Sequence, residues 1–455
     1  RFPRIAKFAS GATWYRDHVA GGDFTGWAVP SILAGKLGSR RMLPTAEVFP
    51  DNIFTVLGPG RQVHSFETVT ELCPVEICPD GNQGEAPDAQ FANEFVKAKF
   101  RPYSAAEISR WINGMPVGEN SLSFVHLKLP HLPLQFTPDS HRYFGGTLLM
   151  PNNLFVKHWV AGESAISFIQ HRHLWQAGYA DRIVGQILQQ IRRNGDFDQA
   201  MIVITGDHGV SFDRADLRRD ATDTNKGATL NPPLIIKYPD QQFGEISTAP
   251  TQAIDIYPTI AQELGAEIPP TEGRPVSEAT PGRVMTVSKD LMSRIEVTAP
   301  EIRADRKEVL ALQSRRLGNR GLWALGPRSQ LIRRPAPRVA AVPRARAILD
   351  TPGAIRNADH SAYMVPALVA GRLRRIAPGK TLALAWNGRI VATTRSFRYR
   401  GQIRFGAMVP PSVMSRGSNR LRLYRVTADN LRQIKCFHKV CAKPAPKKGS
   451  KRKRK

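Results

Sequence analysis

The chain has 455 residues, of which 42% are hydrophobic and 23% charged, values that are ordinary for a protein with a sizeable core. Wholesale disorder is therefore excluded, and no run approaches the roughly 18 consecutive apolar residues of a membrane span. The net charge of +27 is unevenly placed, because 37 Lys and Arg but only 6 Asp and Glu lie from Glu301 onward. This imbalance favours an anionic partner, although a solvated, disordered end is an equally good account of the tail KKGSKRKRK. Nucleic acid is not expected as the partner, because aromatic residues are not interleaved with the basic ones as a base-stacking platform requires.

The first informative segment, residues 23–35 (DFTGWAVPSILAG), places a Thr-Gly step at the start of a short apolar stretch that ends at Gly35. A hydroxyl at the N-terminus of a helix faces free backbone N–H groups, which suits Thr25 as an attacking oxygen on a phosphoryl or sulfuryl centre. The alternative is that Thr25 is a plain N-terminal cap.

Residues 123–129 (SFVHLKL) predict a strand that ends at Pro130. His131 follows between two prolines, which restrict the backbone and can hold the His131 side chain directed into a cleft. A purely structural histidine is the alternative at this position.

Residues 180–194 predict an amphipathic helix that stops at Gly195, and residues 200–205 (AMIVIT) predict a fully buried strand. Together with a further strand at 233–237, this alternation predicts an α/β layered domain with its chemistry just beyond the strand ends. Asp207 and His208 occupy such a place between two glycines, where a carboxylate and an imidazole can share one divalent cation. A structural Asp-His pair is the alternative.

The remainder of the chain predicts a different organisation. Residues 276–345 are rich in Pro and Arg and indicate a linker with local structure, residues 346–435 indicate a small β-rich appendage, and residues 436–455 are a basic tail. The Asn387-Gly388 step predicts a hairpin turn within the appendage. Four cysteines form two close pairs, Cys73/Cys78 and Cys436/Cys441, whose spacing favours small disulfide loops over free thiols.

Taken together, the segments of residues 1–275 resemble the sulfatase family of the alkaline phosphatase superfamily, and more narrowly its bacterial membrane-anchored members with a C-terminal β appendage. The resemblance implies a catalytic domain with a central, mostly parallel sheet. It is carried by the set and order of the following motifs: Phe2-Pro3, Thr25 to Gly35, Pro130-His131-Leu132-Pro133, Tyr179-Ala180-Asp181, Thr205-Gly206-Asp207-His208-Gly209, Pro233 to Lys237 and Asp255-Ile256-Tyr257-Pro258-Thr259.

The resemblance implies a metal-dependent ester hydrolase or phosphotransferase. By position, Thr25 is the nucleophile and a metal ligand, Asp207 and His208 are further metal ligands, and His131 touches the ester or its leaving oxygen. The metal is a divalent ion such as Mn, Zn, Ca or Mg, and the substrate is a phosphate or sulfate ester, for example of an envelope glycan or lipid.

The sequence departs from the family pattern in two ways. Sulfatases carry a Cys or Ser that becomes formylglycine, whereas threonine cannot, so Thr25 favours phosphate esters over sulfate esters. The family's first strand and its acidic metal ligand would precede Phe2-Pro3, so we expect a missing N-terminal part that carries this strand and a membrane anchor. That anchor would hold the protein at the cell envelope, outside the cytoplasm. The alternatives are a sulfatase in the broad sense and an inactive binder of anionic envelope polymers.

Overall fold

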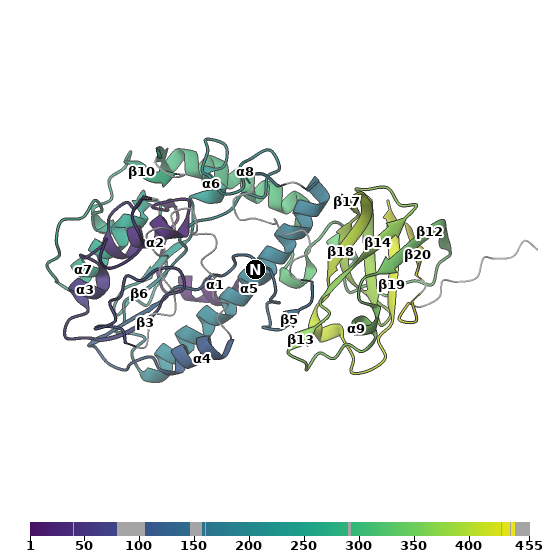
Figure 1. Cartoon of the computed structure of the whole chain (residues 1–455), viewed down its shortest axis with the longest axis horizontal. Helices are drawn as coiled ribbons and strands as arrows, with labels where there is room; N and C mark the ends of the chain where they lie inside the picture. Colours follow the sequence, from purple (N-terminus) through teal and green to yellow (C-terminus); the bar gives the residue numbers. More distant parts are fainter. Residues whose placement is uncertain are drawn as a thin grey trace, which may run out of the picture.

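The computed structural model describes residues 1–39, 41–79, 105–145, 157–159, 161–289, 293–428, 430–436 and 438–441. Figure 1 shows an α/β part and a β-rich part, with the long helix α5 running between them. The α/β fold class with a C-terminal β-rich unit is thus confirmed. The helices are α1 (Pro3–Ala9), α2 (Thr25–Ala34), α3 (Ile53–Leu57), α4 (Ala105–Asn113), α5 (Glu163–Asn194), α6 (Lys226–Thr229), α7 (Ile256–Glu263), α8 (Ala299–Leu317) and α9 (Pro352–Arg356).

The α/β part contains a four-stranded sheet and three short two-stranded pairs. The sheet has the order β6-β7-β1-β8. Strands β3 and β4 form a separate pair and run parallel to each other. The strands of this part are β1 (Thr13–Tyr15), β2 (His18–Val19), β3 (Gln62–Phe66), β4 (Ser121–Val125), β5 (Arg142–Tyr143), β6 (Ile202–Thr205), β7 (Leu234–Lys237), β8 (Glu245–Ser247), β9 (Thr251–Gln252), β10 (Val284–Lys289) and β11 (Ser293–Thr298).

The expectation of a mostly parallel sheet is wrong for the four-stranded sheet. Strand β7 runs antiparallel to both β6 and β1, and only β1 and β8 are parallel there. A parallel connection needs a crossover that returns the chain to the starting edge of the sheet. Between β6 and β7 the structure has only the one-turn helix α6, so β7 starts near the edge where β6 ends.

Helix α2 forms where the sequence predicts it and packs into the core of the α/β part. All of its residues after Thr25 are buried, and Gly35 ends the helix with a φ of 62°, a conformation that favours glycine. Val29 and Leu33 lie in one apolar cluster with Ile236 of β7. Full burial of such side chains contributes about 1.5–3 kcal/mol each, so this packing fixes the position of the start of α2.

Helix α5 is twice as long as predicted, because the segment 180–194 is only its C-terminal half. It ends at Gly195 with a φ of 87°, as expected. Its N-terminal half packs against the β-rich part, where Phe168 stacks on Phe397 with ring centroids 6.2 Å apart. Nearer its C-terminal end, Asp181 accepts hydrogen bonds from the backbone N–H groups at the start of α1.

The stretch 276–345, expected as a linker with local structure, contains the β10–β11 hairpin and helix α8. Two ion pairs join α8 to the α/β part, Arg306 with Asp17 at 3.0 Å and Glu301 with Lys226 at 2.7 Å. Helix α8 is therefore attached to the α/β part, whereas Leu322, Leu325 and Val342, later in this stretch, lie in the core of the β-rich part.

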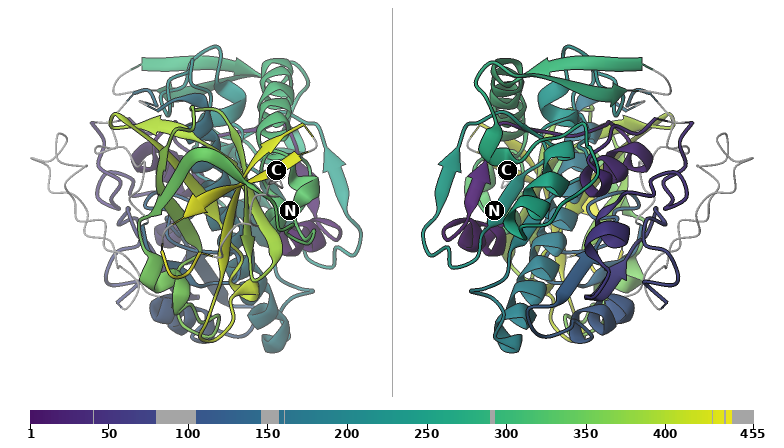
Figure 2. Two further views of the ribbon diagram at one scale, coloured as in Figure 1. Left: turned by 90° about the vertical axis from the view of Figure 1, so that its right-hand side faces the viewer. Right: turned by 90° about the vertical axis from the view of Figure 1, so that its left-hand side faces the viewer.

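The β-rich part is one eight-stranded sheet of order β16-β15-β19-β20-β12-β14-β18-β17, which curls around its own apolar core (Figure 2). The predicted hairpin is confirmed, since Asn387 and Gly388 join β15 to β16 with positive φ angles of 48° and 88°. The strands are β12 (Ala341–Leu349), β13 (Met364–Val365, paired with β5), β14 (Leu368–Arg374), β15 (Thr381–Trp386), β16 (Arg389–Arg395), β17 (Phe397–Tyr399), β18 (Gln402–Met408), β19 (Leu421–Thr427) and β20 (Asn430–Cys436).

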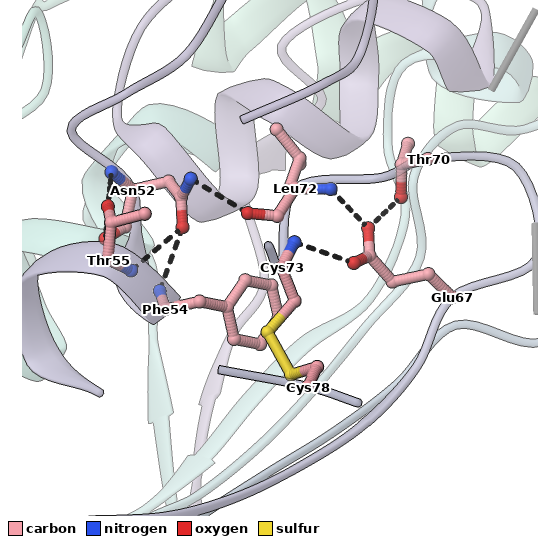
Figure 3. Close-up of a disulfide and its surroundings, with 8 residues drawn as sticks. All are labelled: Asn52, Phe54, Thr55, Glu67, Thr70, Leu72, Cys73 and Cys78. Carbon is pink, nitrogen blue, oxygen red and sulfur yellow. Dashed lines mark hydrogen bonds between the residues drawn. A yellow bond between two sulfur atoms is a disulfide. The ribbon is translucent and has the colours of Figure 1, made fainter. Parts of the chain in front are cut away.

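Both cysteine pairs form disulfides in the structure, Cys73–Cys78 and Cys436–Cys441. Figure 3 shows the first of them beside Glu67, whose carboxylate accepts hydrogen bonds from the backbone N–H groups of Leu72 and Cys73. The same carboxylate accepts a bond from Thr70. The disulfide loop is thus held to the rest of the α/β part by a buried carboxylate. Across the described residues, no helix has the length and apolarity that a membrane crossing requires.

Candidate active site

The site is built around the turn that follows β6. The backbone N–H of His208 donates to Asp207 Oδ1 at 2.8 Å, which fixes the carboxylate directly beyond the strand. Gly209 N donates to Thr229 O at 2.7 Å, and a Cβ on Gly209 would lie 2.1 Å from Ala228 O. Only glycine permits this approach, so the Asp-His-Gly turn is fixed against α6 by its sequence.

Helix α2 brings Thr25 to this turn. Its hydroxyl donates to Asp207 Oδ2 at 2.6 Å and lies 3.4 Å from His208 Nε2. Phe24, not Thr25, is the N-cap residue of α2, and no side-chain capping bond is present. The alternative of Thr25 as a plain N-cap therefore does not hold, and its hydroxyl faces the Asp-His pair.

His131 reaches the same place from the segment after β4. That strand ends at Val125, four residues earlier than predicted, because Leu129 N turns back to donate to Leu127 O at 2.7 Å. His131 Nδ1 lies 2.7 Å from its neighbour's carbonyl, Leu132 O, which makes Nδ1 the protonated nitrogen. Its Nε2 is left to face the site.

Arg219 is a site residue that the sequence reasoning missed. One of its terminal nitrogens lies 3.0 Å from His208 Nε2 and the other 3.5 Å from His131 Nε2. The guanidinium also lies 4.6 Å from the centroid of the Phe24 ring. The side chain is almost fully buried, so a fixed cation stands beside Thr25 and the two imidazoles.

The electrostatics of these groups follow from burial and from their mutual contacts. Burial would raise the pKa of Asp207, but His208, His126 and the hydrogen bond from Thr25 outweigh it and hold this pKa well below its usual range. Burial, reinforced by the charge of Arg219, lowers the pKa of His131 to about 3. The site at neutral pH thus combines an ionised carboxylate with neutral imidazoles.

These residues line a cavity of about 310 Å³. One end carries Thr25, Asp207, His208 and Arg219, which lie close together, and Lys128 and Arg218 also line the cavity. Burial lowers the pKa of Lys128 to about 8, so this amine is still largely protonated at pH 7. The other lining residues are mostly aliphatic and aromatic. A small anionic group has a complementary charge beside Arg219 at the Thr25 end.

The donor set at this end fits one face of a divalent cation. Thr25 Oγ1, Asp207 Oδ2 and His208 Nε2 lie within 3.5 Å of one another. His208 Nδ1 lies 2.9 Å from Gly209 O, which makes Nδ1 the protonated nitrogen, so Nε2 carries the lone pair. In this structure that lone pair faces the Arg219 nitrogen at 3.0 Å, so a cation at Nε2 would require the guanidinium to move aside. No cluster of three or more His, Cys, Asp or Glu suited to a metal occurs among the described residues. Beside the Asp207-His208 pair, the Thr25 hydroxyl is a further oxygen in reach of the same position.

The two acids closest in sequence to Thr25 have other partners. Asp17 is fully buried against Arg306 and Arg303. Asp23 Oδ2 accepts from the backbone N–H of Ala221 at 2.9 Å.

Comparison with known proteins finds a family match for the central part of the chain. Residues 104–266 match the Sulfatase family model, in agreement with the resemblance that the motifs carry. The chain is similar to an ulvan-active sulfatase from Formosa agariphila, with 26% identity over 163 residues. That alignment covers 34% of this chain and 31% of the relative, so the chain spans about a third of the length of the curated relative it matches.

Two solved structures are also similar in outline. Phosphonate monoester hydrolases from Silicibacter pomeroyi and Agrobacterium radiobacter share 17% and 18% identity with this chain, at TM-scores of 0.45 and 0.44. The alignments cover 64% and 63% of this chain and 76% and 74% of those proteins. The region matched by the family model includes His131, Asp207 and His208 but not Thr25.

Proposed function

We propose that the chain is a metal-dependent ester hydrolase or phosphotransferase that acts on phosphate esters with Thr25 as its nucleophile. The contact that supports this proposal is the 2.6 Å hydrogen bond from the Thr25 hydroxyl to Asp207, at the edge of a cavity that also contains Arg219. A hydroxyl held by an ionised carboxylate, beside a fixed cation, suits attack on an anionic ester.

In the first step the Thr25 oxygen bonds to phosphorus and the bond from phosphorus to the leaving alcohol breaks. The alcohol departs with a proton equivalent to the one that Thr25 loses. Water or an acceptor alcohol then displaces Thr25 and restores its hydroxyl. Asp207 is too weak a base to take this proton alone, because its pKa is held low, so its role is to orient the hydroxyl and to bind a cation.

Arg219 supplies positive charge for the non-bridging oxygens of the transferred group. Two of its nitrogens face imidazole nitrogens, and a guanidinium has five N–H donors in all, so donors remain for a ligand. His131, kept neutral by burial, fixes the orientation of this guanidinium and lies where a leaving oxygen would pass.

Thr25, Asp207 and His208 would hold a divalent ion, such as Mn, Zn, Ca or Mg. When bound, such an ion lowers the pKa of a coordinated hydroxyl and offsets charge on the ester. The two disulfides suit an oxidising compartment, which supports a location outside the cytoplasm at a bacterial envelope.

Sulfate-ester hydrolysis is the second candidate, because residues 104–266 match the Sulfatase family and the curated relative is an ulvan-active sulfatase. Thr25 is the argument against it, since threonine cannot be converted to formylglycine. The choice between these two activities rests on this residue.

The test compares hydrolysis of bis-p-nitrophenyl phosphate, p-nitrophenyl phosphate and p-nitrophenyl sulfate by the wild type and by Thr25→Ala and Thr25→Ser variants. Each assay is run with Mn²⁺, Zn²⁺, Ca²⁺ or EDTA. We expect metal-dependent phosphoesterase activity that Thr25→Ala abolishes and Thr25→Ser partly retains. Sulfatase activity that survives Thr25→Ala would overturn the assignment of the nucleophile.

A further inference from the structure

The outer face of the eight-stranded sheet carries a row of basic residues across three adjacent strands. Arg346 in β12 stands opposite Arg374 in β14 on one side and opposite Lys435 in β20 on the other. We name these three residues the basic row. One step along the strands, Arg372 of β14 stands opposite Arg404 of β18. Residues opposite one another point to the same side of a sheet, so these side chains share one face.

This face is the outside of the sheet. The residues that alternate with the basic ones point inward and are buried, among them Ala347, Leu373 and Phe405. Elsewhere the same outer face is covered by helix α5, whose Phe168 ring would lie 2.5 Å from a Cβ on Gly406. Helix α5 does not cover the C-terminal end of β14, where Arg372 and Arg374 are exposed.

The arrangement is unfavourable for folding. Like charges directly opposite one another in a sheet repel. Here Arg346 of the basic row faces two cations, and next to the row Arg372 faces Arg404. An ion pair with Asp350 neutralises Arg404. Residues 341–436 contain 18 Lys and Arg but only 3 Asp and Glu, so this part of the chain has too few acids to balance the rest. A feature that opposes local stability in this way is typical of a functional surface.

We propose that the basic row binds a linear polyanion with closely spaced phosphate or sulfate groups. Neighbouring strands are about 4.8 Å apart, so the row presents cations at steps that match successive charges of such a polymer. The register places one aromatic residue, Phe397, directly opposite one of the five basic positions, Arg404. The Phe397 ring is buried against Phe168 and is not accessible to a base, which favours recognition by charge alone. This inference is independent of the proposed activity at Thr25.

The test measures binding of long-chain inorganic polyphosphate to the full chain by fluorescence anisotropy over a range of salt concentrations. The variant replaces the row with Arg346→Gln, Arg374→Gln and Lys435→Gln. Its matched control removes the same charge from three exposed sites of the same part of the chain, Arg356→Gln, Lys380→Gln and Arg420→Gln. The tail of the chain is common to both variants, so the ratio of their Kd values isolates the row.

We expect the row variant to weaken polyphosphate binding at least tenfold and to lower the salt slope by about 2–3, and the control to change Kd less than threefold. The row variant should also unfold at an unchanged or higher temperature, because repulsion within the sheet is relieved. Equal weakening by both variants, or no binding by the wild type, would overturn the proposal. Binding that is retained by the row variant, or that occurs only with vesicles of phosphatidylglycerol or only with DNA, would do so as well. Dextran sulfate in a parallel series distinguishes sulfate from phosphate polymers.

Discussion

Replacing Arg219 with lysine tests whether the guanidinium binds the transferred group. Lysine keeps the positive charge but cannot present two donors in a fixed plane to the nitrogens of His208 and His131, which Arg219 approaches at 3.0 and 3.5 Å. Loss of one preorganised donor to a developing negative charge costs about 2.7–4 kcal/mol, so kcat/KM for bis-p-nitrophenyl phosphate should fall by about 10²–10³-fold. The inhibition constant for inorganic phosphate should rise with it.

The control is Arg283→Lys, which changes another buried arginine that pairs with a carboxylate, Asp255, at 2.6 Å. This control should lower the unfolding temperature without changing kcat/KM more than threefold. If Arg219→Lys leaves both kcat/KM and the phosphate inhibition constant within threefold of the wild type while the protein stays folded, the role of Arg219 in binding the ester is wrong.

Three further predictions concern stability. Burial lowers the pKa of His18 to about 3, so the stability that this neutral histidine maintains is present above pH 6.5 and is lost as the pH falls. Urea unfolding at pH 7 and pH 5 should show that His18→Asn flattens the pH dependence by about 2 kcal/mol. Joint replacement of Cys73 and Cys78 by serine should reduce the free energy of unfolding by about 2 kcal/mol, the loop entropy of this short disulfide ring, and an unchanged value would contradict that account. Gly406→Ala places a Cβ against Phe168 and should cost about 1–3 kcal/mol, measured as a lower unfolding midpoint.

The sequence predicts those parts of the site that depend on local patterns. Asp207 and His208 follow a short β-rich run, and the glycine after them is required by its approach to Ala228. Thr25 starts an apolar helix whose end at Gly35 is also a local feature. Each of these positions follows from a neighbourhood of about ten residues, so the motifs place them without knowledge of the tertiary structure.

The contacts that the sequence does not predict are between segments far apart in the chain. Arg219 lies in an irregular segment between β6 and β7. Without a helical or strand periodicity, the sequence does not show which of Arg218 and Arg219 faces a site and which faces solvent. The direction of β7 was mispredicted for a related reason, since it depends on how this irregular segment returns to the sheet. A buried strand has the same composition in either direction.

Asp23 explains how these distant segments are brought together. Its carboxylate accepts from Ala221 N at 2.9 Å and from the indole N–H of Trp27 at 3.3 Å, so it joins the loop of Arg219 to the first turn of α2. Thr25 lies two residues after Asp23, and Arg219 two residues before Ala221. The proposed nucleophile and the proposed anion-binding cation are therefore positioned by one buried carboxylate. An acid so placed contributes to the site through geometry, because displacing Asp23 would shift the threonine hydroxyl and the guanidinium relative to each other.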